Sequence, residues 1–140
     1  MKPQLLALLT AAAWGIGGYF EKKGLHAGHL PPQVGITVRT GIALVVLTLI
    51  SWPQLRTLGQ AGGKSLLALG VGGGLVAGSL GMLCFYAALK GAPLNRVMPI
   101  AFTSPLFGFL AAVVFGGEVV TVKGVVGMLL TVSGIALLTL

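Results

Sequence analysis

Residues 66–89 read LLALGVGGGLVAGSLGMLCFYAAL, and this stretch decides the fold. It contains no charged side chain from Leu66 to Leu89. Because an α-helix rises about 1.5 Å per residue, about 20 apolar residues are enough to cross the hydrocarbon core of a bilayer, which is roughly 30 Å thick. The stretch is continuously apolar and does not alternate, which favours a helix over a strand of a membrane barrel. It is therefore predicted to span a membrane as a helix.

Four more apolar runs flank this stretch, and together the five fill almost all of the 140 residues. The flanking runs are Leu5–Phe20, Val34–Trp52, Val97–Phe115 and Val119–Leu140. Lipid offers the backbone no hydrogen-bond partner, so each run must satisfy its own polar groups as a helix. The predicted fold class is all-α integral membrane, with five transmembrane helices in one bundle over residues 1–140.

The first run has a second interpretation, as a cleaved secretory signal peptide. Lys2 and the small residues Ala11–Ala13 fit that pattern. The apolar stretch nevertheless continues past Ala13 to Phe20, and four further spanning runs follow. We therefore expect an uncleaved first helix.

Composition agrees with a membrane protein. Charged residues make up only 8% of the chain and apolar residues 56%, whereas a typical soluble domain is about 25% charged. Glu21 and Glu118 are the only acids. The net charge is +7, but the nine Lys and Arg residues stand singly or in one pair, mostly in the connections. We interpret these cations as topology signals and contacts with lipid headgroups, and we expect no nucleic-acid partner.

Two charged residues stand at the same end of the first two runs. Arg39 lies inside the second run, where a charge usually faces a cavity or a partner; the alternative is that its long side chain snorkels to the headgroups. Glu21 directly follows the first run, so it can pair with Arg39 or with a neighbouring lysine. If the first helix continues a turn or more beyond Phe20, Glu21 is shielded and suited to proton coupling. Otherwise it is an exposed interfacial carboxylate.

Trp14 and Tyr86 carry polar groups inside the spans. Trp14 is far from either interface, so it either packs within the bundle or lines a cavity and contacts an organic substrate. Trp52 ends the second run and fits an interfacial belt. The candidates for substrate binding or coupling are Trp14, Glu21, Arg39 and Tyr86.

The sequence has no arrangement typical of an enzyme. Ser79 and Ser104 are hydroxyl groups within the spans, but a nucleophilic serine needs a base within reach. Both histidines, His26 and His29, lie in the first connection, and two histidines supply too few ligands for a zinc site. We expect no catalytic residue, no metal and no cofactor.

Small residues recur at helical spacing in two runs, and two prolines interrupt another. The small-residue faces are Gly70, Gly74, Gly78 and Gly81, and Gly124, Gly127, Thr131 and Gly134. Such spacing lets helix backbones approach closely in lipid, either within the bundle or between subunits. Pro99 and Pro105 are expected to kink the fourth run.

Several short motifs occur in a definite order along the chain. They are Trp14-Gly15 with Lys22 eight residues after the tryptophan, Arg39, Tyr86-Ala87-Ala88-Leu89-Lys90, Ser104-Pro105, Gly117-Glu118, and the pair Gly127 and Gly134. The ordered set resembles the EamA-like domain of the drug/metabolite transporter superfamily, and the resemblance covers all five runs.

The resemblance implies a small-metabolite transporter or exporter that works by alternating access in the inner (cell) membrane of a prokaryote. Familiar members carry two five-helix units in tandem as inverted repeats, whereas this sequence holds one, half of such a ten-helix transporter. It is therefore expected to bind a small organic metabolite as an antiparallel homodimer, or together with a related chain. The rival interpretations are an accessory membrane subunit without transport of its own and, third, an intramembrane enzyme.

The cations permit insertion in both orientations, which an antiparallel homodimer requires. With five spans, the side of the N-terminus holds Lys2, Arg56, Lys64 and Lys123. The opposite side holds Lys22, Lys23, Lys90 and Arg96, with Arg39 as a fifth. These nearly equal numbers give little positive-inside bias, so dual topology is expected.

Overall fold

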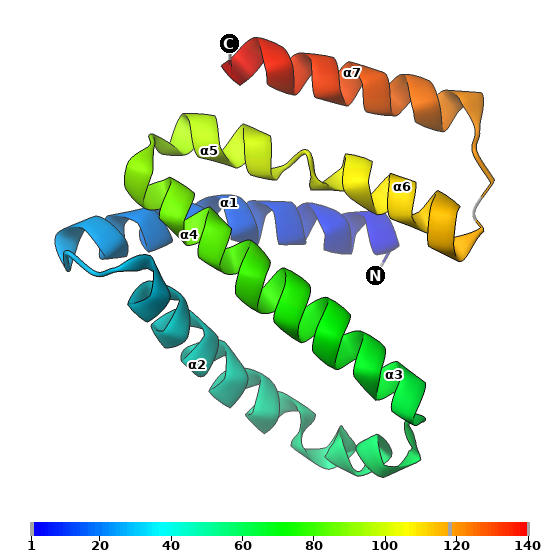
Figure 1. The fold of residues 1–140 in the computed structure, drawn as a ribbon. Coiled ribbons are helices and arrows are strands. Elements are labelled where there is room, and N and C mark those ends of the chain that lie inside the picture. The colour runs from blue at the N-terminus through cyan, green and yellow to red at the C-terminus, as the bar shows by residue number, and fades with distance from the viewer. Residues whose placement is uncertain (1, 118, 140) are drawn as a thin grey trace. The chain divides into compact units, whose positions relative to one another are not determined.

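The computed structural model describes residues 2–117 and 119–139, and every regular element in these ranges is a helix (Figure 1). The helices fall into two units, residues 1–91 and residues 92–140. Glu118, the second acid, lies outside the described residues. We describe each unit by itself.

Unit 1 begins with two long helices that both start at a proline. Helix α1 is Pro3–Ala27 and helix α2 is Pro32–Ser51. A proline fits the first turn of a helix because its fixed φ is helical and its missing N–H would have no partner there. Helix α1 therefore continues well past Phe20, the end of the apolar run, as the shielding of Glu21 requires.

The end of α1 is fixed by a backbone cap. The amide of Leu30 donates to Leu25 O over 3.1 Å, and the amide of His29 donates to His26 O over 3.2 Å. These two bonds form a Schellman motif, which needs a left-handed residue after the helix. His29 occupies that position with φ 51°, although Gly28 stands directly before it.

A His29→Gly substitution is expected to raise the free energy of unfolding by about 0.5–1 kcal/mol. Glycine adopts a positive φ without the steric penalty that His29 pays, and this gain exceeds the extra entropy of an unfolded glycine. His29→Ala keeps the penalty and serves as the control. Thermal unfolding in detergent measures the difference, and an unchanged or lower stability of the glycine variant would contradict the cap assignment.

The rest of unit 1 contains a short helix and a long composite one. Element η1, Trp52–Gln60, is a 3₁₀-helix in a segment predicted to be a simple connection. Helix α3 is Gly63–Leu67, η2 is a π-helix over Ala68–Gly81, and α4 is Met82–Gly91; the three follow one another without a break.

The π-helix η2 changes the expected alignment of glycines. Its hydrogen bonds run from residue i to i+5, so its turn is wider than that of an α-helix. Ser79 shows this spacing, because its Oγ donates to Gly74 O, five residues earlier, over 3.0 Å. A π-helical turn holds between four and five residues, so Gly70, Gly74 and Gly78 stay near one line, whereas Gly81, three residues further on, turns away from it.

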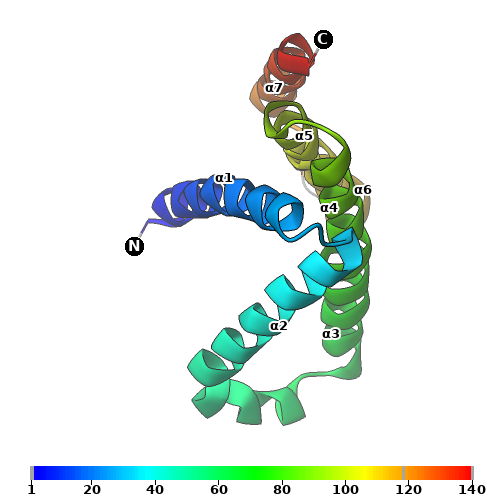
Figure 2. The same ribbon diagram turned by 90° about the vertical axis from the view of Figure 1, so that its left-hand side faces the viewer.

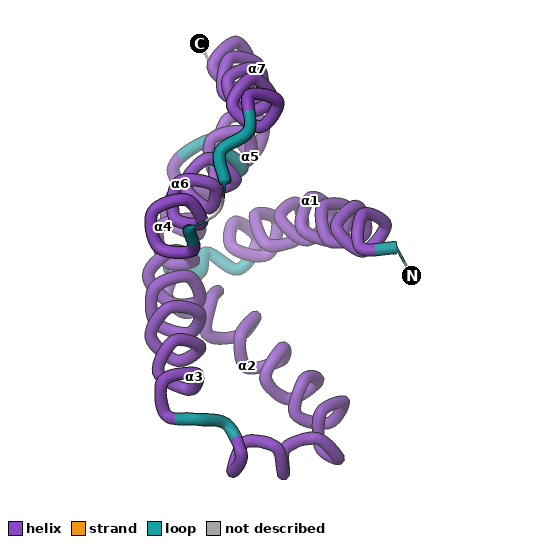
Figure 3. Tube along the Cα trace, turned by 90° about the vertical axis from the view of Figure 1, so that its right-hand side faces the viewer, coloured by secondary structure: helices purple, strands orange, loops and turns teal. Residues whose placement is uncertain are grey.

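The core of unit 1 lies where the C-terminal part of α1 meets α2 and α4. Its buried apolar residues are Leu25, Ile36, Tyr86 and Leu89. The three helices converge at the α1–α2 connection, whereas the N-terminal half of α1 projects away from α2 and α4 (Figure 2). The view from the opposite side shows the same divergence (Figure 3). Side chains near the end of α1 are therefore the ones that meet the other helices.

Unit 2 holds three helices: α5 is Leu94–Ala101, α6 is Ser104–Gly116 and α7 is Val122–Thr139. The chain breaks between α5 and α6 at Phe102 and Thr103, which confirms the expected kink. Pro99 lies inside α5 and Pro105 in the first turn of α6; neither has an N–H to continue a helical ladder. Gly117 ends α6 at φ 65°.

The small-residue face of α7 has little contact within unit 2. A carbon added at Gly124 would lie 3.1 Å from Thr121 Oγ1 and 3.7 Å from Phe109 Cε2. A carbon added at Gly127 or Gly134 would meet nothing within 4 Å. Within the described part of unit 2, no neighbour contacts the small-residue face at these two glycines, and the close contact expected there, within the bundle or between subunits, stays a prediction.

Within the described residues, four helices are long and apolar enough to cross a membrane: Pro32–Gln60, Gly63–Gly91, Leu94–Gly116 and Val122–Thr139. Their apolar side chains are largely uncovered by protein; Leu49, Leu69 and Leu130 are each at least 69% exposed. Lipid is the environment in which such surfaces are stable. Helix α1 has 25 residues but carries three charges near its end and is not among the four. The count of five spans stays a prediction.

Candidate functional site

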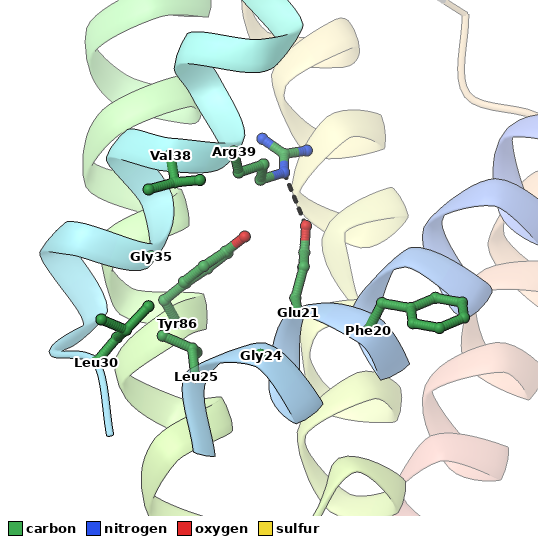
Figure 4. A pocket seen from close by; sticks show the side chains of 9 residues that line it. All are labelled: Phe20, Glu21, Gly24, Leu25, Leu30, Gly35, Val38, Arg39 and Tyr86. Carbon is green, nitrogen blue, oxygen red and sulfur yellow. Dashed lines mark hydrogen bonds and ion pairs between the residues drawn. The ribbon is translucent and has the colours of Figure 1, made fainter. Parts of the chain in front are cut away.

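An ion pair joins the two charged residues singled out in the sequence. Arg39 Nε on α2 donates to Glu21 Oε1 on α1 over 2.8 Å (Figure 4). The Glu21 side chain is 18% exposed and the Arg39 side chain 40%. Glu21 is thus a shielded carboxylate inside a continuing helix, and Arg39 turns towards it. The predicted Glu21–Arg39 pair is confirmed.

Tyr86 completes this cluster from a third helix. It lies on α4, is only 2% exposed, and points its hydroxyl group towards the ion pair (Figure 4). The phenol interacts electrostatically with both Glu21 and Arg39. Three of the four candidate residues, from three helices, therefore lie together.

The cluster borders a pocket with a volume of about 260 Å³. The pocket is lined by Phe20, Glu21, Gly24, Leu25, Leu30, Gly35, Val38, Arg39 and Tyr86. Leucine and valine side chains form the wall on one side, and the ion pair forms the opposite edge (Figure 4). An apolar wall with a few convergent polar groups is typical of a small-molecule site. The small volume suits a small ligand.

The guanidinium of Arg39 retains binding capacity. Only its Nε bonds to Glu21, and its two terminal nitrogens point away from that carboxylate (Figure 4). A guanidinium carries five N–H donors in a planar fork. A ligand that reaches the pair therefore meets a proton-accepting carboxylate and a fork of donors side by side.

Trp14 is not brought into this pocket. It lies on α1 two turns before Glu21, it is 59% exposed, and it is absent from the nine lining residues. The reason is the divergence of α1, whose N-terminal half leaves the other helices of unit 1 (Figure 2). A substrate contact by Trp14 stays a prediction.

Gly35 is the site residue that sequence reasoning missed. It lies on α2 one turn before Arg39. A carbon added at its Cβ position would lie 2.5 Å from Leu25 Cδ2 and 3.1–3.2 Å from the Tyr86 ring. A larger residue at this position would force the end of the Leu25 side chain and the Tyr86 ring to move, so glycine suits the close contact among the three helices. The sequence offers only a weak signal for this residue, namely that it lies one helical turn before Arg39.

Two lysine side chains donate hydrogen bonds to backbone carbonyl groups next to the pocket. Lys22 Nζ donates to Leu89 O over 2.7 Å, and His26 Nε2 reaches the same carbonyl over 3.3 Å. Lys90 Nζ donates to Leu30 O. Cations at a helix C-terminus satisfy its last carbonyls and complement its dipole. His26 therefore lies in the last turn of α1, not in the connection where it was expected, and its exposed ring bonds to the end of α4.

A second hollow lies on another side of α2, against η2. Its volume is about 330 Å³, and it is lined by Ile36, Thr37, Thr40, Gly41, Leu44, Gly78 and Ser79. Two of its hydroxyl groups are already bonded within their own helices, Thr37 to Gln33 O and Ser79 to Gly74 O. It lacks charge and is a weaker candidate for a coupling site. Over residues 2–117 and 119–139, no group of three metal-ligating side chains is present.

Comparison with known proteins agrees with this architecture. The model of the EamA-like transporter family matches residues 1–140. An uncharacterized protein of Methanocaldococcus jannaschii is 26% identical over 136 residues, which cover 97% of this chain and 95% of that protein. No solved structure matches the chain significantly. A match over the full sequence shows that the chain belongs to the EamA-like transporter family, in the drug/metabolite superfamily, and is an integral multi-pass membrane protein.

Proposed function

We propose that this protein moves a small organic metabolite across the membrane by alternating access, with the Glu21–Arg39–Tyr86 pocket as its coupling site. The observation that supports this most is the ion pair itself. A charged pair in a membrane protein is usually functional, because charges are expensive there. This pair borders a pocket of small-molecule character in a member of a transporter family.

Proton and ligand can each break the Glu21–Arg39 ion pair, which provides a coupling mechanism. While Glu21 is ionised, it holds Arg39 through the 2.8 Å bond. Protonation removes the charge that holds the guanidinium, and α1 is then freed from α2 at this point. A ligand that binds the guanidinium of Arg39 also breaks the ion pair, because it takes Arg39 away from Glu21. Proton and ligand thus both bias the same contact between two helices.

We further propose that the working unit has five spans per chain and pairs with an inverted copy. Support comes from the nearly balanced cations, from the uncovered face at Gly127 and Gly134, and from the relative in Methanocaldococcus jannaschii, of which 95% is covered by this chain. The inner membrane of a prokaryote is the proposed location.

Purified protein in liposomes tests the function. A thermal-shift screen over small amines, amino acids, sugars and lipid precursors first finds a ligand, because a ligand that favours the folded state raises its stability. Flux of that ligand is then measured with and without a proton gradient. Gradient-driven flux by this chain alone supports the proposal, whereas flux only after a second protein is added identifies an accessory subunit.

Single cysteines at the two termini are expected to report dual topology. In a Cys84→Ser background, an impermeant thiol reagent applied to intact cells should label a part of each terminal population, since both orientations are present. Complete labelling of one terminus with none at the other would exclude dual insertion of this chain. Cys84 is exposed, so its removal is needed for a clean signal.

Gly127→Leu and Gly134→Leu are each expected to weaken chain association about tenfold, because leucine holds two helix backbones apart. Within unit 2, a carbon added at either glycine meets nothing within 4 Å, so the packing of this unit should be unaffected. Ala136→Leu, at an exposed position on another side of α7, is the matched control. Association is measured by energy transfer in liposomes. Wild-type association of both glycine variants would remove α7 from the interface.

A further inference from the structure

The 3₁₀-helix η1 has one apolar edge with a period of three. A 3₁₀-helix has three residues per turn, so every third side chain lies on the same line. In Trp52–Gln60 that line holds Trp52, Leu55 and Leu58, which are 69%, 36% and 52% exposed. The apolar spacing in the sequence thus matches the helix type in the structure, and the resulting stripe has little protein cover.

The other two lines of η1 are polar or small. One holds Gln54, Thr57 and Gln60, and the other holds Pro53, Arg56 and Gly59. Thr57 Oγ1 donates to Gln54 O over 2.8 Å, along its own line. One side of the helix is therefore apolar and the remainder hydrophilic, as in helices that lie at a membrane surface.

The direction of η1 also fits a membrane surface. Pro53 cannot donate to the helical ladder of α2, and the α-helical part of the candidate span Pro32–Gln60 accordingly ends at Ser51, where η1 follows. The segment between α2 and α3, coloured teal to green, turns away from the direction of α2 in two perpendicular views (Figures 1 and 2). An amphipathic helix that leaves the axis of a span at its end is suited to lie along the interface.

The charges near η1 favour an anionic surface. Arg56 lies on η1 and Lys64 begins the next helix, and the sequence has no acid between Glu21 and Glu118. Their natural counter-ions are thus outside this part of the chain. Lipid phosphates next to an interfacial helix provide them.

We propose that η1 is an interfacial anchor that lies in the headgroup layer of an anionic membrane. Trp52, Leu55 and Leu58 enter the boundary of the acyl chains, while Arg56 and Lys64 bind lipid phosphates. This anchor sets the depth of the α2 and α3 ends in the bilayer, and it does not depend on the transported substrate.

Brominated lipids, which quench tryptophan on contact, test the depth of the stripe. In a Trp14→Phe, Trp52→Phe background, a single tryptophan is placed at Leu58, on the apolar line, or at Thr57, one residue away on the polar line. In liposomes, Leu58→Trp is expected to be quenched about twofold or more strongly than Thr57→Trp by lipids brominated high in the acyl chain. Equal quenching overturns the proposal.

Two further measurements complete the test. Brominated phosphatidylglycerol should quench Leu58→Trp about twofold to fivefold more than brominated phosphatidylcholine. Adding Arg56→Gln and Lys64→Gln should remove that preference. If the protein that keeps Arg56 and Lys64 shows no preference, the anionic assignment is overturned. A blue-shifted tryptophan that bromine cannot reach identifies a second protein copy on the stripe and overturns the lipid assignment. If the engineered positions disturb folding, native Trp52 in Trp14→Phe protein gives the same readout.

Discussion

Glu21→Gln is expected to lower proton-driven uptake about tenfold or more while the protein still folds and binds its ligand. Glutamine cannot exchange a proton, so the switch between the paired and the released Arg39 is lost. Arg39 is 40% exposed and tolerates the loss of its partner, because solvent or headgroups reach it. Uptake into liposomes with an imposed proton gradient measures the coupled activity.

Counterflow separates coupling from folding in this experiment. Exchange of labelled for unlabelled ligand needs no proton, so Glu21→Gln should retain it. Arg39→Gln is the informative contrast, because it leaves the less exposed carboxylate unpaired and should lower the free energy of unfolding by about 1–3 kcal/mol. Undiminished proton coupling in well-folded Glu21→Gln protein would remove Glu21 from the mechanism.

Gly35→Leu is expected to destabilise the protein by about 2–3 kcal/mol, because it overpacks the contact among α1, α2 and α4. The first added carbon already lies 2.5 Å from Leu25 Cδ2 and 3.1 Å from the Tyr86 ring. The end of the Leu25 side chain can move, but the buried ring has less freedom. The added side chain also fills the pocket, so the thermal shift caused by ligand should disappear.

Gly41→Leu is the matched control for this prediction. It lies on the same helix, and a carbon added there meets nothing within 4 Å. It should unfold no more easily than the wild type, since replacing a glycine within a helix is favourable in itself. Equal stabilities of Gly35→Leu and Gly41→Leu in detergent would show that the close approach at Gly35 is unimportant.

The charged part of the site was predictable because charges are so rare in this sequence. Glu21 and Arg39 stand out as ionised groups next to or inside apolar runs, and the requirement to neutralise them predicted their pairing. Tyr86 was found by its polar group inside a span. Gly35 was not found, because it is one of 23 glycines and the sequence does not say which of them faces a ring.

The helical fold was predictable from apolar length, but the type of helix was not. The segment after Trp52 was interpreted as a connection because it separates two apolar runs and begins with Pro53, which stops a helix. The π-helix η2 was not predicted either, because a continuous apolar run indicates the length of a helix but not the width of its turn. Trp14 was expected either to pack within the bundle or to line a cavity, because the divergence of α1 is a tertiary feature that the sequence does not reveal.

The bonds from Lys22 to Leu89 O and from Lys90 to Leu30 O end on backbone carbonyls. Every amino acid supplies such a carbonyl, whatever its side chain. Substitutions at Leu30 or Leu89 therefore leave the acceptors in place, and a change at either lysine cannot be compensated by a change at its partner. These bonds, from α1 to α4 and from α4 to the connection between α1 and α2, should thus leave no pairwise covariation signal among homologous sequences, although they hold the segments that form the pocket.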